Sequence, residues 1–466
     1  MKYLPLALTS LLCACTVGPD YVSPEIDAPA EFVFQEVFDL LNEGKQVPPV
    51  DTNWWEGFAD PLLTQLVEDA IENNQRIASA VARVKSARAN VRLADAGDTL
   101  RTGAGADTNV SKQRDLDADE TDSDSLLGGV LSFVLPIDIA GRNRREVEAA
   151  LANLESSESG LRNIVLTTST DVVSEYLRLR GNQRQLELLR ESVALQEKTL
   201  SIVNSRYQSG LSPELDLRRA ETSVQRLQAD IPPLLESLIS SRLVLANLTG
   251  QYPGAYETTL NDNTSIPGYQ YQLVSTIPVD VLRQRPDIQQ TEARMKQTVA
   301  EIGVAEADFY PVFDLFGQMQ ISTAGIIGGP GMDLLIASIG AMIDQVITDG
   351  GARDANLDVA KARAEEALAD YNQALLDAAQ SIETTLAGLK LSLIRQESLE
   401  QAVQSSARSF EQAERLYQLG LSSFLDVVDA QRVLASAEQQ LATERTSYAT
   451  QIATLFRVLG TNINDS

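Results

Sequence analysis

The stretches RYQSGLSPELD (residues 206–216) and RLYQLGLSSFLD (residues 415–426) repeat one pattern within a single chain of 466 residues. Seven of their last ten positions are identical when residue i is set beside residue i+210. The same register, with an offset of 210 or 211, extends over residues 74–250 and 285–460. A unit of about 210 residues is too long for a solenoid repeat, so the sequence indicates a tandem duplication of one structural unit.

Each copy has the apolar spacing of long helices. Apolar residues recur three and four positions apart before the repeated glycine and again after it, as in amphipathic helices that pack in pairs. No proline interrupts the second copy after Pro330. A helix over 353–419 is therefore predicted, with a length of roughly 100 Å at 1.5 Å per residue. Pro232 and Pro233 predict a kink in the returning helix of the first copy alone.

The repeated Gly-Leu-Ser predicts a tight turn between two antiparallel helices. A glycine can end the first helix with a positive φ, which assigns this role to Gly210 and Gly420. A serine can cap the next helix, which assigns this role to Ser212 and Ser422. Each copy is therefore predicted to end in a helical hairpin whose tip carries the duplicated motif.

Far from these tips, each copy loses its helical period, at about residues 101–137 and 311–346. Polar and apolar residues alternate at 103–111 and 313–322, which predicts strands with one apolar and one polar face. The segment MDLLIASIGAMI (332–343) fits a strand or a short helix equally well. Two strands are thus expected in each copy.

These strands are the predicted route through a bilayer, because no run of 18 apolar residues follows the amino terminus. Four strands cannot close a barrel alone, since unpaired strand edges are not tolerated in lipid. Even eight strands leave an interior filled by side chains, so a pore is predicted to need three or more subunits.

The amino terminus MKYLPLALTSLLCAC has the layout of a secretory signal, with a lysine, a short apolar run and small residues. The spacing around Cys13 and Cys15 is similar to a bacterial lipobox. We expect cleavage before Cys15 and lipidation of its sulfur. Two or three acyl chains, at about 0.8 kcal/mol per buried methylene, would hold this end firmly in one leaflet.

Composition argues against several classes of protein. The net charge is −27 and the pI is near 4.4, which disfavours nucleic acid as a partner. The chain has no histidine, so the usual general base and the commonest metal ligand are missing. We therefore expect neither an enzyme nor a cofactor, and neither a catalytic residue nor a metal site.

Several segments together resemble the TolC-like outer-membrane efflux proteins, in the lipidated, NodT-type branch of the outer membrane factors of RND tripartite systems. They are CTVGPDYVSPE from Cys15, WWEGFADPLLTQLVEDAIENN from Trp54, LRQRPDIQQTEARMKQTVAEIGVAEADFYP from Leu282, and the two tips. The resemblance covers nearly the whole chain. Its segments occur in the family's order, which makes it far more specific than a single motif.

This resemblance implies a mainly α-helical protomer with a membrane β region, internally duplicated. Three protomers would form a twelve-stranded β-barrel in the outer membrane, continued by a long coiled-coil helical barrel through the periplasm. The homotrimer would dock on a periplasmic membrane-fusion adaptor protein, which connects it to an inner-membrane RND-type pump. The implied function is a passive exit duct for exported substrate, lipid-anchored in the outer membrane, with no catalytic role.

The resemblance also implies the residues of a periplasmic gate. In the family, acidic residues just after the second tip narrow the entrance, which corresponds to Asp426 and Asp429, and Leu425 would add an apolar constriction. The two aspartates lie on one helical face by their spacing. Six carboxylates around one axis would favour cations and raise their own apparent pKa values. The alternative is that both are ordinary solvated residues near a turn.

A closed-state latch between tip helices would involve Tyr417 and Asp216. Some relatives use a further arginine near the second tip. This chain has Ser422 at that position, so this part of the latch departs from the family pattern. The tip residues that would dock on the adaptor are Gly210, Leu211, Ser212, Gly420, Leu421 and Ser422.

The predicted organisation follows the duplication. It consists of a signal peptide (1–14), a lipidated segment (15–60), a first repeat (61–250, with its tip at about 208–214), an equatorial linker (251–284), a second repeat (285–460, with its tip at about 418–424) and a tail (461–466).

A different class of function stays open. A lipid-anchored coiled-coil tether or scaffold would account for the helices and the acylation, although not for the amphipathic strands. The acidic stretch at 115–124 could bind divalent cations, but a solvated loop is the favoured interpretation. Trp54 and Trp55 are expected to pack the amino-terminal segment on the helices.

Overall fold

The computed structural model describes residues 16–24, 32–34, 36–43, 45, 53–114, 121–260, 265–273, 281–326 and 332–460. The chain divides into two compact units, and each combines segments from distant parts of the sequence. Unit 1 contains the described parts of 1–25, 83–158 and 290–372, and unit 2 contains those of 26–82, 159–289 and 373–466. Cys13 and Cys15, residues 115–120 and the tail at 461–466 lie outside the described residues.

The duplication is visible in the elements themselves. The first copy runs through α4 (Gln75–Asp95), β1 (Arg101–Arg114), β2 (Thr121–Ile137), α5 (Arg142–Gln208), α6 (Glu214–Ala229) and α7 (Ile231–Leu248). The second copy runs through α9 (Pro286–Ala307), β3 (Val312–Ile326), β4 (Met332–Asp344), α10 (Ala352–Gln418) and α11 (Phe424–Leu459). Helices α5 and α10 each have 67 residues, and their first residues are 210 positions apart, as the sequence register predicts. The short elements α2 (Val37–Asn42), η1 (Trp54–Phe58) and α3 (Pro61–Asn73) precede α4, η2 (Ala96–Asp98) lies between α4 and β1, and α8 (Val281–Gln284) precedes α9.

The returning helices of the two copies differ as the prolines predict. Helix α6 ends before Asp230, and α7 starts at Ile231 with Pro232 and Pro233 in its first turn. Proline lacks the N–H that would continue the hydrogen-bond ladder of a helix, so it is tolerated at this new start. The corresponding α11 continues without interruption to Gly460, whose φ of 66° ends it.

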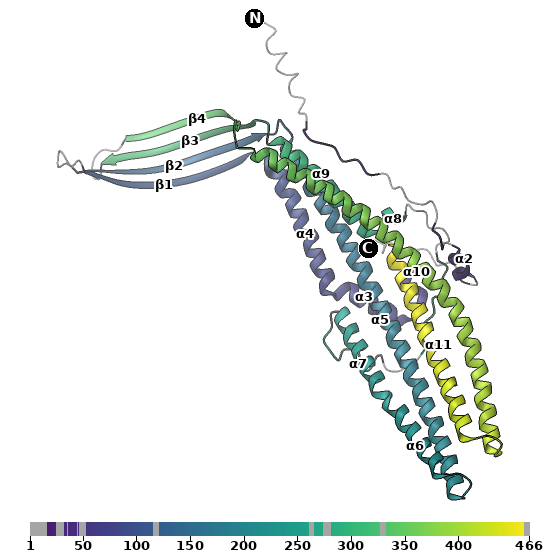
Figure 1. The fold of residues 1–466 in the computed structure, drawn as a ribbon. Coiled ribbons are helices and arrows are strands. Elements are labelled where there is room, and N and C mark those ends of the chain that lie inside the picture. Colours follow the sequence, from purple (N-terminus) through teal and green to yellow (C-terminus); the bar gives the residue numbers. More distant parts are fainter. Residues whose placement is uncertain are drawn as a thin grey trace. The chain divides into compact units, whose positions relative to one another are not determined.

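Unit 1 contains one antiparallel four-stranded sheet, with the order β1-β2-β3-β4 (Figure 1). The segment 332–343, which could have been a helix, is strand β4. Cross-strand pairing divides the sheet into two kinds of row. One row consists of Ala104, Leu131, Met319 and Ala337. The adjacent row, which points to the opposite face, consists of Gly103, Ser132, Gln318 and Ser338.

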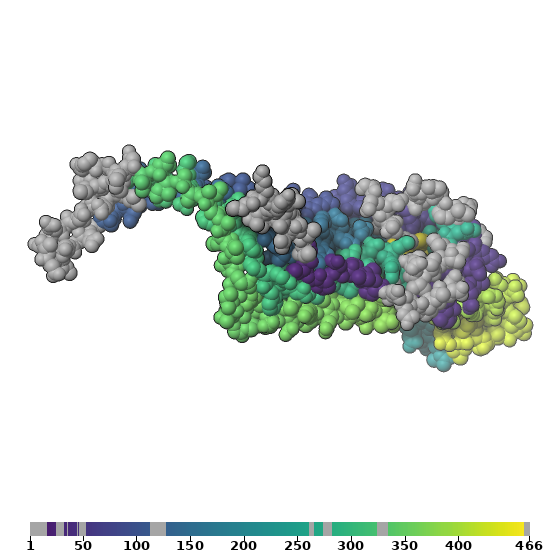
Figure 2. Space-filling view, turned by 90° about the horizontal axis from the view of Figure 1, so that it is seen from above, coloured from purple at the N-terminus to yellow at the C-terminus, as the bar shows by residue number. Residues whose placement is uncertain are grey.

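One face of the sheet is therefore apolar and the other mixes polar and apolar side chains, because residues directly opposite each other share a face. The apolar side chains are not covered within one chain: Leu131 is 52% exposed and Ile339 is 73% exposed. In Figure 2 the green atoms of β3 and β4 extend beyond the start of α10, which belongs to the same unit. The outer edges of β1 and β4 have no partner strand among the described residues.

The amino-terminal segment of unit 1 is held by a buried arginine. The Arg145 side chain is 4% exposed, and its guanidinium donates to the carbonyl oxygens of Val17 (3.0 Å) and Gly18 (3.0 Å) and to the carboxylate of Asp20 (2.9 Å). Gly18 has a φ of +89° and lies against the backbone of Gly303 in α9. This segment is thus a packed part of the fold.

In unit 2, a polar network and an aromatic contact hold the segment of η1 and α3 against α5 and α11. The Tyr176 hydroxyl of α5 donates to Asp60, and Arg180 donates to that hydroxyl at 2.7 Å. Asp60 also caps α3 by accepting from the Leu62 N–H at 3.0 Å. Trp54 stacks on Phe456 of α11 with ring centroids 4.9 Å apart, which confirms that this segment packs on the helices.

Among the described residues, none of the helices is both long and apolar enough to cross a membrane.

Candidate functional site

The two tips have nearly the same backbone. At the first tip the Leu211 N–H donates to the Arg206 carbonyl oxygen at 2.8 Å, and at the second the Leu421 N–H donates to the Leu416 carbonyl oxygen at 2.8 Å. Gly210 has a φ of 68° and Gly420 a φ of 74°, a region that favours glycine. Both glycines end a long helix, as predicted from the sequence.

The predicted serine caps were wrong by one residue. Helix α6 has Pro213 at its N-cap, without a side-chain cap, and Ser212 instead donates its hydroxyl to Asp216 at 3.2 Å. Helix α11 is capped by Ser423, whose hydroxyl accepts from the Asp426 N–H while the Asp426 carboxylate accepts from the Ser423 N–H at 2.8 Å. This reciprocal pair needs an acid three residues after the serine, which selects Ser423 over Ser422.

A small core joins the two hairpins of one chain. It consists of the buried residues Val203, Ala220, Phe410, Tyr417, Phe424 and Val427. These residues come from α5, α6, α10 and α11, so both tips contribute to the same cluster. Phe424 is 3% exposed and its ring lies 6.1 Å from that of Tyr417. The two tips of a chain are thus packed together by apolar contact.

Arg206 adds a polar contact to this core that the sequence did not single out. Its guanidinium lies over the Tyr417 ring, 4.9 Å from the centroid, and Nη1 donates to the Tyr417 carbonyl oxygen at 3.4 Å. Position 416, which corresponds to Arg206 in the second copy, is leucine. The duplication therefore gave no signal for this arginine, although it directly precedes the repeated motif.

The predicted latch residues lie near one another without a hydrogen bond between them in the described part of the chain. The Tyr417 hydroxyl is buried and has no hydrogen-bond partner among the described residues. Burial raises the pKa of Tyr417 and the charge of Asp216 raises it further, while the charge of Arg206 and the nearby Ser212 hydroxyl lower it. Asp216 accepts from Ser212 and lies 3.9 Å from Arg219.

The three predicted gate residues share the outward side of α11. Leu425 is 53% exposed, and Asp426 and Asp429 are also exposed, whereas their neighbours Phe424 and Val427 face the core. Hydrogen bonds from the hydroxyl and N–H of Ser423 hold the pKa of Asp426 below its ordinary value. Asp429 pairs with Arg432 at 2.7 Å, with both side chains mostly exposed. In one chain, these groups are thus available to a neighbouring molecule.

The remaining tip positions present apolar side chains to solvent. Leu211 is 68% exposed and Leu421 is 72% exposed, and no Cβ contact lies within 4 Å of Gly210 or Gly420. Exposed leucines at the end of a helical hairpin are suited to contact with a second protein.

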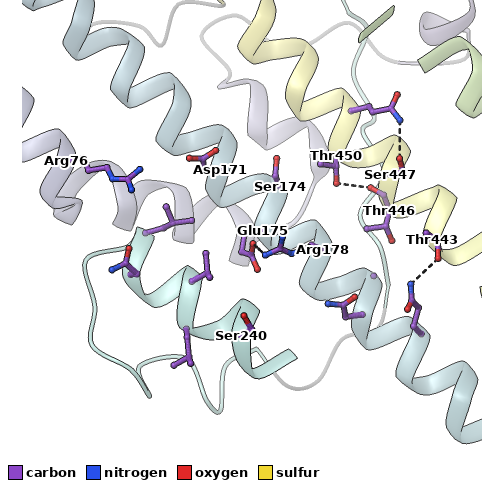
Figure 3. Close-up of a pocket in the computed structure, with 18 residues that line it drawn as sticks. Arg76, Asp171, Ser174, Glu175, Arg178, Ser240, Thr443, Thr446, Ser447 and Thr450 are labelled. Atoms are coloured by element: carbon purple, nitrogen blue, oxygen red, sulfur yellow. Dashed lines mark hydrogen bonds and ion pairs between the residues drawn. The ribbon is translucent and has the colours of Figure 1, made fainter. Parts of the chain in front are cut away.

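A separate groove of about 900 Å³ lies in unit 2, between α5, α7 and α11 (Figure 3). Its charged groups are Arg76, Asp171, Glu175 and Arg178, so positive and negative side chains are equal in number. Glu175 is paired with Arg178, and burial raises the pKa of Asp171. The other residues drawn include threonines of α11 and aliphatic residues of α7. This mixed lining is not selective for either sign of charge, and no sequence motif pointed to it.

Among the described residues, no group of three or more metal-binding side chains is found.

The model of the family described as "Outer membrane efflux protein" matches residues 66–251 and 277–461. The two matched segments correspond to the two copies of the repeat.

Individual proteins of known sequence or structure are similar along nearly the whole chain. Nodulation protein T of Rhizobium leguminosarum biovar trifolii is 29% identical over 468 residues, covering 99% of this chain and 98% of that protein. The cation efflux system protein CusC of Escherichia coli is 27% identical, with 98% of each covered. The solved structure of the outer-membrane channel OprN matches with a TM-score of 0.86 and 27% identity, over 96% of this chain and 99% of that chain. That of VceC from Vibrio cholerae matches with a TM-score of 0.78 and 26% identity, over 90% and 100%.

The duplicated hairpins, the amphipathic sheet and these matches lead to one assignment: the chain belongs to the outer membrane efflux protein family.

Proposed function

We propose that three copies of this chain form a passive channel through the outer membrane, which serves as the exit duct of a tripartite efflux pump. The observation that carries the proposal is the four-stranded sheet, which has one exposed apolar face and two edges without a partner strand in the described part of the chain. In lipid, each unpaired backbone N–H or C=O group costs several kcal/mol, so the sheet needs partner strands on both sides.

A second copy of the same sheet can supply those strands. Pairing β4 of one chain with β1 of the next repeats around an axis, and three chains would close a barrel of twelve strands. This heterologous contact closes a ring without leaving an edge. The mixed face, which carries Ser132, Gln318 and Ser338, would line a water-filled interior, and the apolar face would contact lipid.

The tips are proposed to face an adaptor protein in the periplasm, which connects the duct to an inner-membrane RND-type pump. The exposed leucines of the two tips support this role. Relatives include proteins named for the efflux of cations and of toluene, so pump-driven export is the function to which we assign this chain. The duct itself needs no catalytic group.

Leu425, Asp426 and Asp429 are proposed to narrow the periplasmic entrance. They face outward from the chain on one side of α11, so three copies would bring them together around the axis. Tyr417 and Asp216 are proposed to take part in closing it. Lipidation of Cys15 is proposed to anchor the amino terminus in the outer membrane, and the Arg145 contact would keep the adjoining residues on unit 1.

Planar-bilayer recording of the purified full-length protein tests this function. Discrete, cation-favouring conductance steps are expected, because the entrance is lined by carboxylates. A lipid-anchored tether would be recovered in membranes but would leave the bilayer sealed, and that result would refute the channel.

A further inference from the structure

We infer that Arg206 is a positioning residue of the closed entrance, and that its stacking on the Tyr417 ring holds the two hairpin tips of each chain together. The inference rests on the proposed function of the tips as a gate. It concerns a contact within one chain, and it assigns the closure to the tyrosine ring and the guanidinium rather than to the tyrosine hydroxyl.

The geometry of the pair supports this role. The guanidinium carbon of Arg206 lies 4.9 Å from the centre of the Tyr417 ring, and Nη1 reaches the backbone oxygen of the same residue at 3.4 Å. A planar guanidinium can stack on an aromatic ring while its edge donates hydrogen bonds, which a lysine cannot do. Both contacts tie the end of α5 to the end of α10.

The surroundings make Tyr417 the main partner of this arginine. Arg206 forms no ion pair with any residue in the described ranges, and its Nε is buried without a hydrogen-bond partner there. The carboxylate of Asp216 accepts a hydrogen bond from Ser212 and lies 3.9 Å from Arg219 instead. An arginine in a partly buried place is expected to have a counter-charge, so the aromatic face is what stabilises its position.

The apolar core beside the pair explains why the contact can act as a latch. Tyr417 is 5% exposed and packs with Phe424, which starts the helix that carries Leu425, Asp426 and Asp429. A displacement of Tyr417 therefore moves the first turn of α11. Two buried polar groups, Arg206 Nε and the Tyr417 hydroxyl, are unpaired within the described chain in this arrangement. Water can reach both groups when the tips separate, which lowers the free-energy cost of opening.

Four variants separate the ring from the hydroxyl. Arg206→Met keeps the aliphatic stem and removes the charge, and Tyr417→Leu removes the ring. Both are expected to raise the open probability of the resting channel about 2- to 30-fold, the range that corresponds to a cation–π contact. Tyr417→Phe keeps the ring and should raise the open probability less than Tyr417→Leu does. Arg206→Met combined with Tyr417→Leu should open no further than either single change.

Arg415→Met is the matched control, because Arg415 lies in the last turn of α10, is 78% exposed and pairs with Glu411. It should leave the open probability unchanged. If Tyr417→Phe opens the channel and Arg206→Met does not, the hydroxyl carries the closure and the inference is overturned.

A second measurement tests this inference independently of the proposed channel function. Spin labels on cysteines at Ser209 and Leu419, both exposed, report the distance between the two tips of one chain. For assembled protein, one chain should be doubly labelled among unlabelled copies. A narrow distance distribution that broadens in Arg206→Met supports the latch, even if no conductance is seen. An unchanged distribution overturns it, whereas a silent bilayer with the unchanged protein contradicts the proposed channel.

Discussion

A Cβ atom on Gly18 would lie 2.4 Å from the Cα of Gly303, so the amino-terminal segment and helix α9 touch backbone to backbone. Two glycines permit this approach, and Arg145 holds the same segment by its hydrogen bonds to the carbonyl oxygens of Val17 and Gly18. The residues that follow the proposed lipid anchor are therefore fixed to unit 1 from Val17 to Asp20.

Gly18→Ala is expected to release this segment. The new methyl group would collide with Gly303, and the φ of +89° would be strained for alanine, so docking should weaken by about 1–3 kcal/mol. Hydrogen exchange of the amides at 17–21 should become faster. Gly268→Ala is the control, because nothing lies within 4 Å of its Cβ position and its φ is not positive. Equal protection in both variants would show that the contact does not hold the segment.

Tyr176→Phe is expected to destabilise unit 2 by about 1–3 kcal/mol. The hydroxyl donates to Asp60 and accepts from Arg180, and the tyrosine is fully buried, so its loss leaves the buried Arg180 and the partly buried Asp60 less satisfied. Denaturant unfolding followed by circular dichroism measures the change. Tyr252→Phe serves as the control, since Tyr252 is 88% exposed and should give no measurable change. A loss below about 0.5 kcal/mol for Tyr176→Phe would contradict the role of this network.

The carboxyl of Asp349 provides a pH prediction. Hydrogen bonds from the Arg353 side chain, and then from the N–H groups of Arg353 and Gly351, lower its pKa from 3.8 to about 2. A carboxyl with a lower pKa in the folded state stabilises the fold above its ordinary pKa and loses that contribution as the pH falls towards about 2. NMR titration should give a midpoint near pH 2, and Arg353→Gln should return it towards 3.8. A midpoint near 3.8 in the unchanged protein would exclude this contact in solution.

Asp426→Ala with Asp429→Ala is expected to widen the entrance. Removing six carboxylates from three chains should raise the resting conductance and weaken block by divalent cations. Single-channel recording in the presence and absence of a divalent cation checks both effects. Unchanged conductance and unchanged block would leave the two aspartates as ordinary solvated residues.

Much of this architecture could be predicted because the duplication repeats both the helical spacing and the turn residues. The two glycines mark the tips, since their φ values are a local property of the backbone. The two prolines mark the interruption between α6 and α7 for the same reason.

Other features depend on contacts that a linear pattern does not contain. The segment 332–343 is apolar on both sides, so only its pairing with β3 decides that it is a strand. The cap of α11 depends on the position of Asp426 relative to Ser423, a one-residue distinction. Arg206 was missed because its role comes from a ring 211 residues away in the sequence.

Native mass spectrometry of protein extracted from membranes in detergent tests the central claim most directly. Because the sheet has an exposed apolar face and two edges that no described strand of the chain pairs with, we predict a single species with the mass of three processed, acylated chains. A stable species with the mass of one chain would contradict the trimeric channel.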